Sequence, residues 1–290
     1  MTFTLTEPTL GSLELHPDGE ATDCGPYIVT DFQIGFPAVR EVVRNRALAD
    51  GVIDDTTYVG ARAITASIIV DQRRGDAQAI IDDLMPYISP RYRPRLTWQI
   101  PGSDEQRSSI VRGADAPVVI GGEKFNTVVA SWVTTTGVIE AAYEQCVLID
   151  PGSDVESGRT YDLTFDRTYP PGLGVGEVVV NNPGNTVADW RCEIFGQVTN
   201  PILEVNGVEM RFDRNGGLTV GQAQSVVIDT RTRTVLLNND PDESRYDRMN
   251  FAEWSWQQVR LQPGQNLVRF DGAAIGPTAK ARFCFRAAYL

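Results

Sequence analysis

The sequence predicts a mainly β protein, with one helix in its first half and strands alone in its second half. Two observations lead to this class. Short segments rich in valine, isoleucine, threonine and aromatic residues recur along the chain, bounded by glycine, proline, asparagine or aspartate. The 26 glycines and 17 prolines are spread over the whole chain, which suits many strands joined by turns.

The predicted strands are short and separated by turn residues. They cover residues 27–34, 58–70, 95–100 and 128–135 in the first half, and 161–165, 177–180, 191–197, 225–229, 235–237, 254–261, 267–270 and 279–289 in the second. The last segment alternates with a period of two, which predicts a strand with one buried face. The side chains that share this face are Ala281, Phe283, Phe285, Ala287 and Tyr289.

One segment has helical spacing. Asp76 can cap a helix that begins at Ala77, and residues 80, 81 and 84 place isoleucine and leucine on one face. Pro86 disfavours helical geometry at Met85, so we expect the helix to end there.

A turn-rich connection at residues 150–158 predicts a domain boundary. We expect residues 1–157 to form a domain of strands with the single helix. Residues 158–290 are expected to form a β-sandwich, because turn signals recur there about every ten residues.

The formal net charge of −12 argues against tight binding to nucleic acid, since phosphate contacts need clustered lysine and arginine. Anionic membrane surfaces would also repel such a chain. Residues 1–7 lack a basic region followed by a long apolar run, so we expect no signal peptide. The apolar stretches are too short to cross a bilayer, and we expect no membrane insertion.

The search for chemistry predicts no catalytic residue, metal site or cofactor. The single histidine, His16, accompanies no nucleophile motif. The glycine-rich run at 172–176 precedes a predicted strand rather than the helix that a phosphate site needs. The acidic run at 238–244 lacks the glycine and the closing glutamate of a calcium loop, which favours a solvated loop.

Four cysteines and a few aromatic residues complete the candidates. Cys24, Cys146, Cys192 and Cys284 are too widely spaced for a zinc site, and buried reduced thiols are the favoured interpretation. Trp254 and Trp256 are expected in the core because they lie two apart on one predicted strand. The candidate glycan contacts are Trp190 and Tyr246, because exposed aromatic rings can stack on sugars.

Several segments resemble siphovirus distal tail proteins, a family of minor tail proteins. In the first half they are residues 46–62, which contain an Asp-Gly turn followed by Gly60-Ala61-Arg62, and residues 96–98, Leu-Thr-Trp. In the second half they are residues 180–186, 192–196, 226–235 and 256–272, followed by the strand to Tyr289. The similar segments occur in the family's order and span most of the chain.

The resemblance implies a tail-tube-like first domain that closes into a homohexameric ring, and a galectin-like second domain. It also implies a place in the baseplate, at the tail tip of a siphophage virion, between the tail tube protein and the tail-associated hub protein. Receptor-binding proteins for host attachment are further expected partners. DNA is expected to pass through the lumen without tight binding, and the chain to be made in the host cytoplasm. The family offers no catalytic residues, so we expect no enzyme.

Two other classes of function stay open from the residues alone. The sandwich could be a carbohydrate-binding module that recognises a host cell-surface glycan, through Trp190 and Tyr246. A cell-wall glycosidase is the second alternative, since 38 acidic residues allow many carboxylate pairs, although nothing in the sequence selects two of them.

Overall fold

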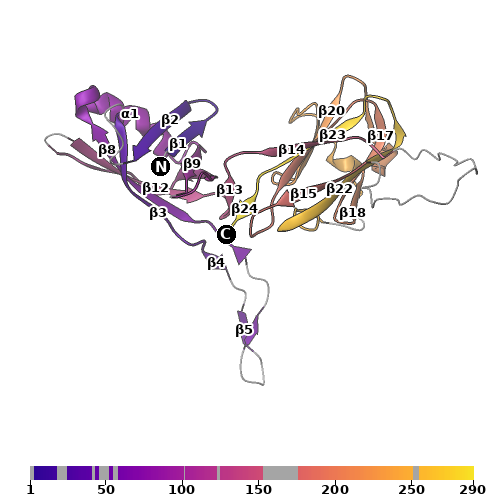
Figure 1. Cartoon of the computed structure of the whole chain (residues 1–290), viewed down its shortest axis with the longest axis horizontal. Helices are drawn as coiled ribbons and strands as arrows, with labels where there is room; N and C mark the ends of the chain where they lie inside the picture. The colour runs from indigo at the N-terminus through magenta and orange to yellow at the C-terminus, as the bar shows by residue number, and fades with distance from the viewer. Residues whose placement is uncertain are drawn as a thin grey trace, which may run out of the picture. The chain divides into compact units, whose positions relative to one another are not determined.

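The computed structural model describes residues 3–17, 25–40, 43–45, 52–54, 58–100, 102–122, 125–152, 176–250 and 255–290. The mainly β class is confirmed. The chain divides into two units: the first is Met1–Tyr143 together with Tyr289–Leu290, and the second is Glu144–Ala288 (Figure 1). The sequence placed a boundary after residue 157, whereas the change of unit comes after Tyr143, because the strand that follows already pairs within the second unit.

The first unit is built on a closed β-barrel. Its strands are β1 (Phe3–Glu7), β2 (Gly11–Pro17), β3 (Tyr27–Ile34), β8 (Ala63–Asp71), β9 (Arg95–Gln99), β10 (Gln106–Gly113) and β12 (Phe125–Thr134). They follow the order β12-β8-β3-β2-β1-β9-β10, and β10 pairs back onto β12. Every pairing is antiparallel except the parallel pair β2–β3.

Three short strands extend this sheet at its two ends. β11 (Val118–Ile120) pairs with the first half of β12, and β13 (Ile139–Ala141) pairs with β10. The C-terminal strand β24 (Ala288–Tyr289) lies next to β13. These three strands therefore lie outside the closed ring of the barrel, with β11 at one end of the sheet and β13 and β24 at the other.

Alternation along the strands fills the barrel. On β8, residues 64, 66, 68 and 70 are buried between partly exposed neighbours, as the period of two requires. The helix α1 (Ala77–Ile88) packs its apolar face on β8, β10 and β12, and Figure 1 shows it beside β8. Two side chains of the barrel donate hydrogen bonds to the backbone of the helix: Tyr27 to the Ile80 carbonyl at 2.8 Å, and Trp132 Nε1 to the Tyr87 carbonyl at 3.1 Å.

The start of the helix is as predicted, and its end is not. Asp76 accepts a hydrogen bond from the Gln78 N–H at 3.2 Å. The helix continues through Pro86 to Ile88. Proline removes one intrahelical bond there, but burial of Tyr87 and Ile88 and the bond from Trp132 hold the last turn.

Two short ladders lie between β3 and β8 in the chain. Among the described residues, β4 (Val39–Arg40) pairs only with β7 (Tyr58–Val59), and β5 (Val43–Asn45) pairs only with β6 (Val52–Asp54). Bonds from the Gly35 N–H to the Ala63 carbonyl and from the Ala38 N–H to the Ala61 carbonyl connect the β3–β8 ladder to β4–β7. The predicted strand 58–70 is therefore two strands, interrupted at residues 60–62.

The second unit consists of two antiparallel five-stranded sheets with alternating buried residues, which is the expected sandwich pattern (Figure 1). One sheet has the order β14 (Gln145–Ile149), β23 (Lys280–Phe285), β16 (Trp190–Phe195), β20 (Ser225–Asp229), β21 (Thr234–Leu237). The other has β15 (Glu177–Asn182), β22 (Gly264–Ile275), β17 (Val198–Val205) and β18 (Val208–Arg211), with β19 (Thr219–Val220) on β17. Single 3-10 turns, η1 (Gln72–Arg74), η2 (Arg214–Gly216) and η3 (Tyr246–Arg248), complete the described elements of the chain.

Two of the predicted strands of the second half differ in the structure. The segment 279–289 is split into β23 and β24, so the last strand belongs to the sandwich up to Phe285 and to the first unit at Tyr289. Phe283 and Phe285 are buried as expected. Residues 255–260 form turns, in which the Gln258 side chain accepts from the Ser255 N–H and its backbone N–H donates back to the Ser255 carbonyl. The predicted strand 161–165 lies outside the described residues.

Candidate functional site

Two of the four cysteines form a disulfide, which corrects the expectation of reduced thiols. Cys146 on β14 faces Cys284 on β23 across the antiparallel ladder, with a Cα–Cα distance of 4.1 Å. Glu144 lies near both sulfurs and completes the spacing of a metal site, but a disulfide has no thiolate to offer a metal. Cys192 is a free, buried thiol whose pKa burial raises, and Cys24 lies outside the described residues.

The motifs that invited a chemical interpretation have structural roles. His16 is a half-buried residue of β2, paired with Ile28 of β3. The acidic run at 238–244 is a tight loop in which Asp240 accepts from the Asp242 N–H at 3.0 Å. Residues 172–175 of the glycine-rich run lie outside the described residues, and β15 follows directly after Gly176.

Arg62 of the Gly60-Ala61-Arg62 motif is buried at the start of the barrel. Its backbone N–H donates to Thr134 Oγ1 at 2.9 Å, and its Nε donates to the Gly137 carbonyl at 2.7 Å. Burial lowers the pKa of this guanidinium, and its Nη2 has no hydrogen-bond partner within the described part of the chain. The motif therefore anchors the entry into β8 to the turn that follows β12.

Trp190 is a core residue and does not serve as a surface glycan contact. Only 2% of it is exposed, and its ring centroid lies 4.9 Å from that of Phe283. Its Nε1 donates to the Val259 carbonyl at 2.6 Å, which satisfies the polar edge of the indole inside the sandwich.

Tyr246 is the candidate glycan contact that reaches solvent, with 40% of the residue exposed. It stacks on Trp256, with ring centroids 6.2 Å apart, and accepts a hydrogen bond from Trp256 Nε1 at 3.2 Å. Trp256 is buried as the sequence predicted, and Trp254 lies outside the described residues. The structure thus does not bring Trp190 and Tyr246 into one site.

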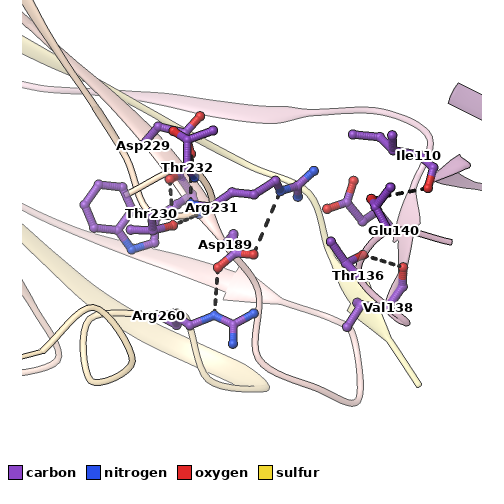
Figure 2. Close-up of polar contacts among 12 residues, drawn as sticks. Ile110, Thr136, Val138, Glu140, Asp189, Asp229, Thr230, Arg231, Thr232 and Arg260 are labelled. Carbon is purple, nitrogen blue, oxygen red and sulfur yellow. Dashed lines mark hydrogen bonds and ion pairs between the residues drawn. The ribbon is translucent and has the colours of Figure 1, made fainter. Parts of the chain in front are cut away.

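A charged cluster in the second unit is centred on Asp189, which Figure 2 shows between two arginines. Its Oδ1 lies 2.7 Å from Arg260 Nε and its Oδ2 lies 3.9 Å from Arg231 Nε. Burial raises the pKa of Asp189, while Arg260 opposes that shift. Asp229 accepts from the backbone N–H groups of Arg231 and Thr232 at 2.8 and 3.1 Å, so it fixes the turn that presents Arg231. The cluster holds together the connections around β16 and β20.

Figure 2 also shows Glu140 of the first unit, near the turn in which Thr136 donates to the Val138 carbonyl at 3.4 Å. Glu140 of β13 is buried and lies 3.0 Å from Arg95 of β9. Arg95 also donates to Ser108 of β10 at 2.9 Å. Through these contacts Arg95 links β9 to β10 and β13, and its positive charge balances the buried carboxylate of Glu140.

Two apolar surfaces of the first unit are exposed. The first, here the root patch, consists of Phe36, Val39 and Val59 around the β4–β7 ladder, with 94% of Phe36 exposed. The second, here the edge patch, is the whole of β11, Val118, Val119 and Ile120, each about half exposed. The sequence did not predict that either surface is exposed, because a short apolar segment has the same pattern in a central strand as in an edge strand.

A cavity of about 410 Å³ lies beside the edge patch. Its lining is mostly apolar and joins the end of α1 to the segment that leads into β11. The lining residues are Met85, Ile88, Ser89, Pro90, Ala114, Asp115, Ala116 and Pro117. Contiguous exposed apolar surface of this kind marks interaction sites more often than solvated faces.

No helix among the described residues is long and apolar enough to cross a membrane.

Neither a protein-family model nor a curated protein sequence matches the chain. Its fold matches solved phage structures. The Dit protein of phage SPP1, a paradigm of the hub adsorption apparatus in phages that infect Gram-positive bacteria, is 13% identical over 99% of both chains, with a TM-score of 0.61. A chain of the phage p2 baseplate in its activated conformation is 10% identical over 98% of this chain and 97% of that one, with a TM-score of 0.49.

Proposed function

We propose that this chain, which has the fold of the SPP1 Dit protein, is a structural virion protein of a long, non-contractile phage tail. In this proposal six copies form a ring at the distal end of the tail, and the ring joins the tail tube to the tail-tip hub and to host-adhesion proteins. The observation that carries the proposal is the agreement in fold over 99% of both chains, which includes both units and not a shared domain alone.

Features of the described residues support a structural role over a catalytic one. The exposed side chains that stand out are apolar, in the root and edge patches. Four residues with nucleophilic or acid–base potential have structural surroundings: Cys146 and Cys284 are joined, Cys192 is buried, and Glu140 is paired. The net charge of −12 suits a lumen through which DNA passes without tight binding.

The mass of the purified full-length chain in solution tests this proposal most directly. We expect a species of six 31.9 kDa chains, and electron microscopy of that species should show a ring with an open centre. A chain that stays monomeric at all concentrations, and that is absent from purified tail tips, contradicts the proposal.

A glycan-binding role for the second unit is the alternative that one observation favours. Tyr246 is exposed and stacked on Trp256, an arrangement that can bind a sugar ring face-on. A glycan array with the full-length chain tests it, with Tyr246→Ala as the variant and Tyr143→Ala, another exposed tyrosine, as the matched control. Binding that is lost in the first variant and kept in the second supports this role.

A further inference from the structure

We infer that the edge patch of one copy binds the root patch of the next copy, so that successive copies are joined head to tail through these two surfaces. The inference rests on the proposed function and names the contact that builds the ring. It is carried by three features of the first unit: an open strand edge, a two-stranded ladder with edges that lack a partner among the described residues, and the separation of the two within one chain.

The edge patch is an open strand edge whose three residues are apolar. β11 pairs on one side with β12, Val118 opposite Val129 and Ile120 opposite Thr127. Within the described residues no strand pairs with its other side. Natural edge strands usually carry a lysine, a proline or a bulge that discourages pairing, and the three residues of β11 are all apolar. Such an edge can accept a strand from another chain.

The root patch belongs to a two-stranded ladder that continues the β3–β8 ladder outward. Among the described residues β4 and β7 pair only with each other, so each of them has one strand edge without a partner there. The exposed Phe36, Val39 and Val59 add apolar surface that this ladder does not bury. A third strand from another chain would supply both the missing hydrogen bonds and the missing burial.

The two patches cannot meet within one copy. Val59 and the root patch precede Ala63, where β8 begins, and the bonds at Gly35 and Ala38 continue the β3–β8 ladder outward at that end. The edge patch lies level with residues 67–69 of β8, across β12. From Ala63 the two patches therefore lie in opposite directions along the strand. A contact between the two patches therefore needs a second copy of the chain.

Phe36 and the cavity beside β11 complete the match. A nearly fully exposed phenylalanine is the kind of aromatic anchor that dominates protein interfaces when it enters a pocket. The cavity of about 410 Å³ has room for such a ring, and it adjoins β11 through Pro117. A contact between two different surfaces of the same chain is heterologous, and heterologous contacts form a ring when the rotation between successive copies closes.

The test uses two charged variants of the full-length chain, one in each patch. Val119→Lys disrupts the edge patch, and Phe36→Lys disrupts the root patch. Tyr143→Lys, at an exposed aromatic outside both patches, is the matched control. All three positions are exposed, so thermal unfolding should be unchanged. If Val119→Lys changes the thermal unfolding, Val119→Thr replaces it. The ring of Val119→Thr should then dissociate at a concentration at least tenfold higher than that at which the wild-type ring dissociates.

We expect each patch variant alone to be monomeric at concentrations where the wild type and Tyr143→Lys form rings. A mixture of the two patch variants should form a one-to-one dimer and nothing larger. The intact root patch of Val119→Lys can bind the intact edge patch of Phe36→Lys, and the second contact is then blocked on both sides. Native mass spectrometry distinguishes these species.

Other outcomes overturn the inference. Patch variants that form normal rings show that the contact lies elsewhere, while the proposed ring stands. Monomeric variants that give no dimer on mixing show that the patches bind other surfaces, such as a second edge patch or a hub protein. A wild-type chain that forms no ring contradicts the proposed function itself.

Discussion

Gly113, at the end of β10, is a residue whose lack of a side chain the fold requires. A Cβ atom built there would lie 1.7 Å from the carbonyl oxygen of Ile88, the last residue of α1. The neighbouring atoms are backbone, so the helix end or the strand would have to move. The close approach of β10 to α1 is thus set by one glycine.

We expect Gly113→Ala to lower the free energy of unfolding of the first unit by about 1–3 kcal/mol, the usual cost of overpacking a core. Gly121→Ala is the control, because its nearest neighbour, Asn126 Oδ1, would be 3.8 Å from the new Cβ. Urea unfolding followed by tryptophan fluorescence measures both. Equal stability of the two variants would mean that the helix end yields without cost.

Asp71, at the end of β8, is a buried carboxylate held by a neighbouring arginine. Arg73 donates to it through its backbone N–H at 3.0 Å, its Nε at 2.9 Å and its Nη2 at 2.9 Å. The side-chain bonds from Arg73 are the main cause of the lowered pKa of Asp71, and desolvation opposes them.

A lowered pKa in the folded state means that Asp71 stabilises the fold above its unfolded pKa of about 3.9 and loses that effect as the pH falls toward the folded value. Below that pKa, between about pH 4 and pH 2, we expect the free energy of unfolding to fall less steeply with decreasing pH in Asp71→Asn than in the wild type. The exposed Asp104→Asn is the control, and its profile should follow the wild type. Identical slopes for all three chains would contradict a role for Asp71.

At the scale of elements, the β14–β23 pair is fastened covalently. The Cys146–Cys284 disulfide closes a loop with a sequence separation of 138, so it restricts the unfolded chain strongly. We expect Cys146→Ser to lower the free energy of unfolding of the second unit by about 2–4 kcal/mol. Leu148→Ser, at an exposed position of the same strand, should change it by less than about 0.5 kcal/mol.

Denaturant titrations with and without a thiol reductant measure this effect. Reduction should shift the wild type to the stability of Cys146→Ser and leave the variant unchanged. A wild type that is indifferent to reductant would show that the strand pairing does not depend on the bond.

Element bounds that depend on local residues could be predicted from the sequence, and those that depend on distant contacts could not. The bounds of β3 and β20 were predicted because turn residues enclose each apolar run, and the start of α1 was predicted because Asp76 is a local cap. The end of α1 was not, since a bond from Trp132, far along the chain, supports its last turn. β1 and β2 were missed because their burial depends on barrel closure.

The candidate site shows the same division between local and distant causes. The disulfide depends on the register of β14 against β23, which no local pattern reveals. Burial of Trp190 depends on Phe283 and Val259, both distant in sequence. Exposure of Phe36 and β11 depends on which strands stand at an edge, a property of the sheet order alone. Composition and the resemblance to distal tail proteins carried the functional hypothesis instead.

At the scale of the whole molecule, the boundary between the units decides which fragments fold. β14 belongs to the second unit, where it pairs with β23 and buries Ile149. We expect a fragment of residues 144–288 to fold as a monomeric sandwich. A fragment of residues 160–288 lacks an outer strand and half of the disulfide, and it should be less stable by at least about 2 kcal/mol.

Circular dichroism and thermal unfolding of the two fragments test this expectation, with size-exclusion chromatography to report association. Equal stability would mean that β14 is dispensable to the sandwich. A longer fragment that assembles into rings by itself would place the ring contacts in the second unit, against the proposed division of roles.

The way the chain enters and leaves the second unit has an evolutionary consequence. The chain leaves the first-unit sheet after β13 and returns to it at β24, so the second unit is an insertion between two strands of that sheet. Near its two ends, Gln145 and Phe285 are opposite each other in one ladder, and the cross-linked cysteines form the next pair. Units with adjacent ends can be exchanged by recombination without rebuilding their host. The barrel can therefore keep its own structure while the inserted unit is replaced. Under the proposed function, a phage lineage could then change what its tail tip presents in one genetic step.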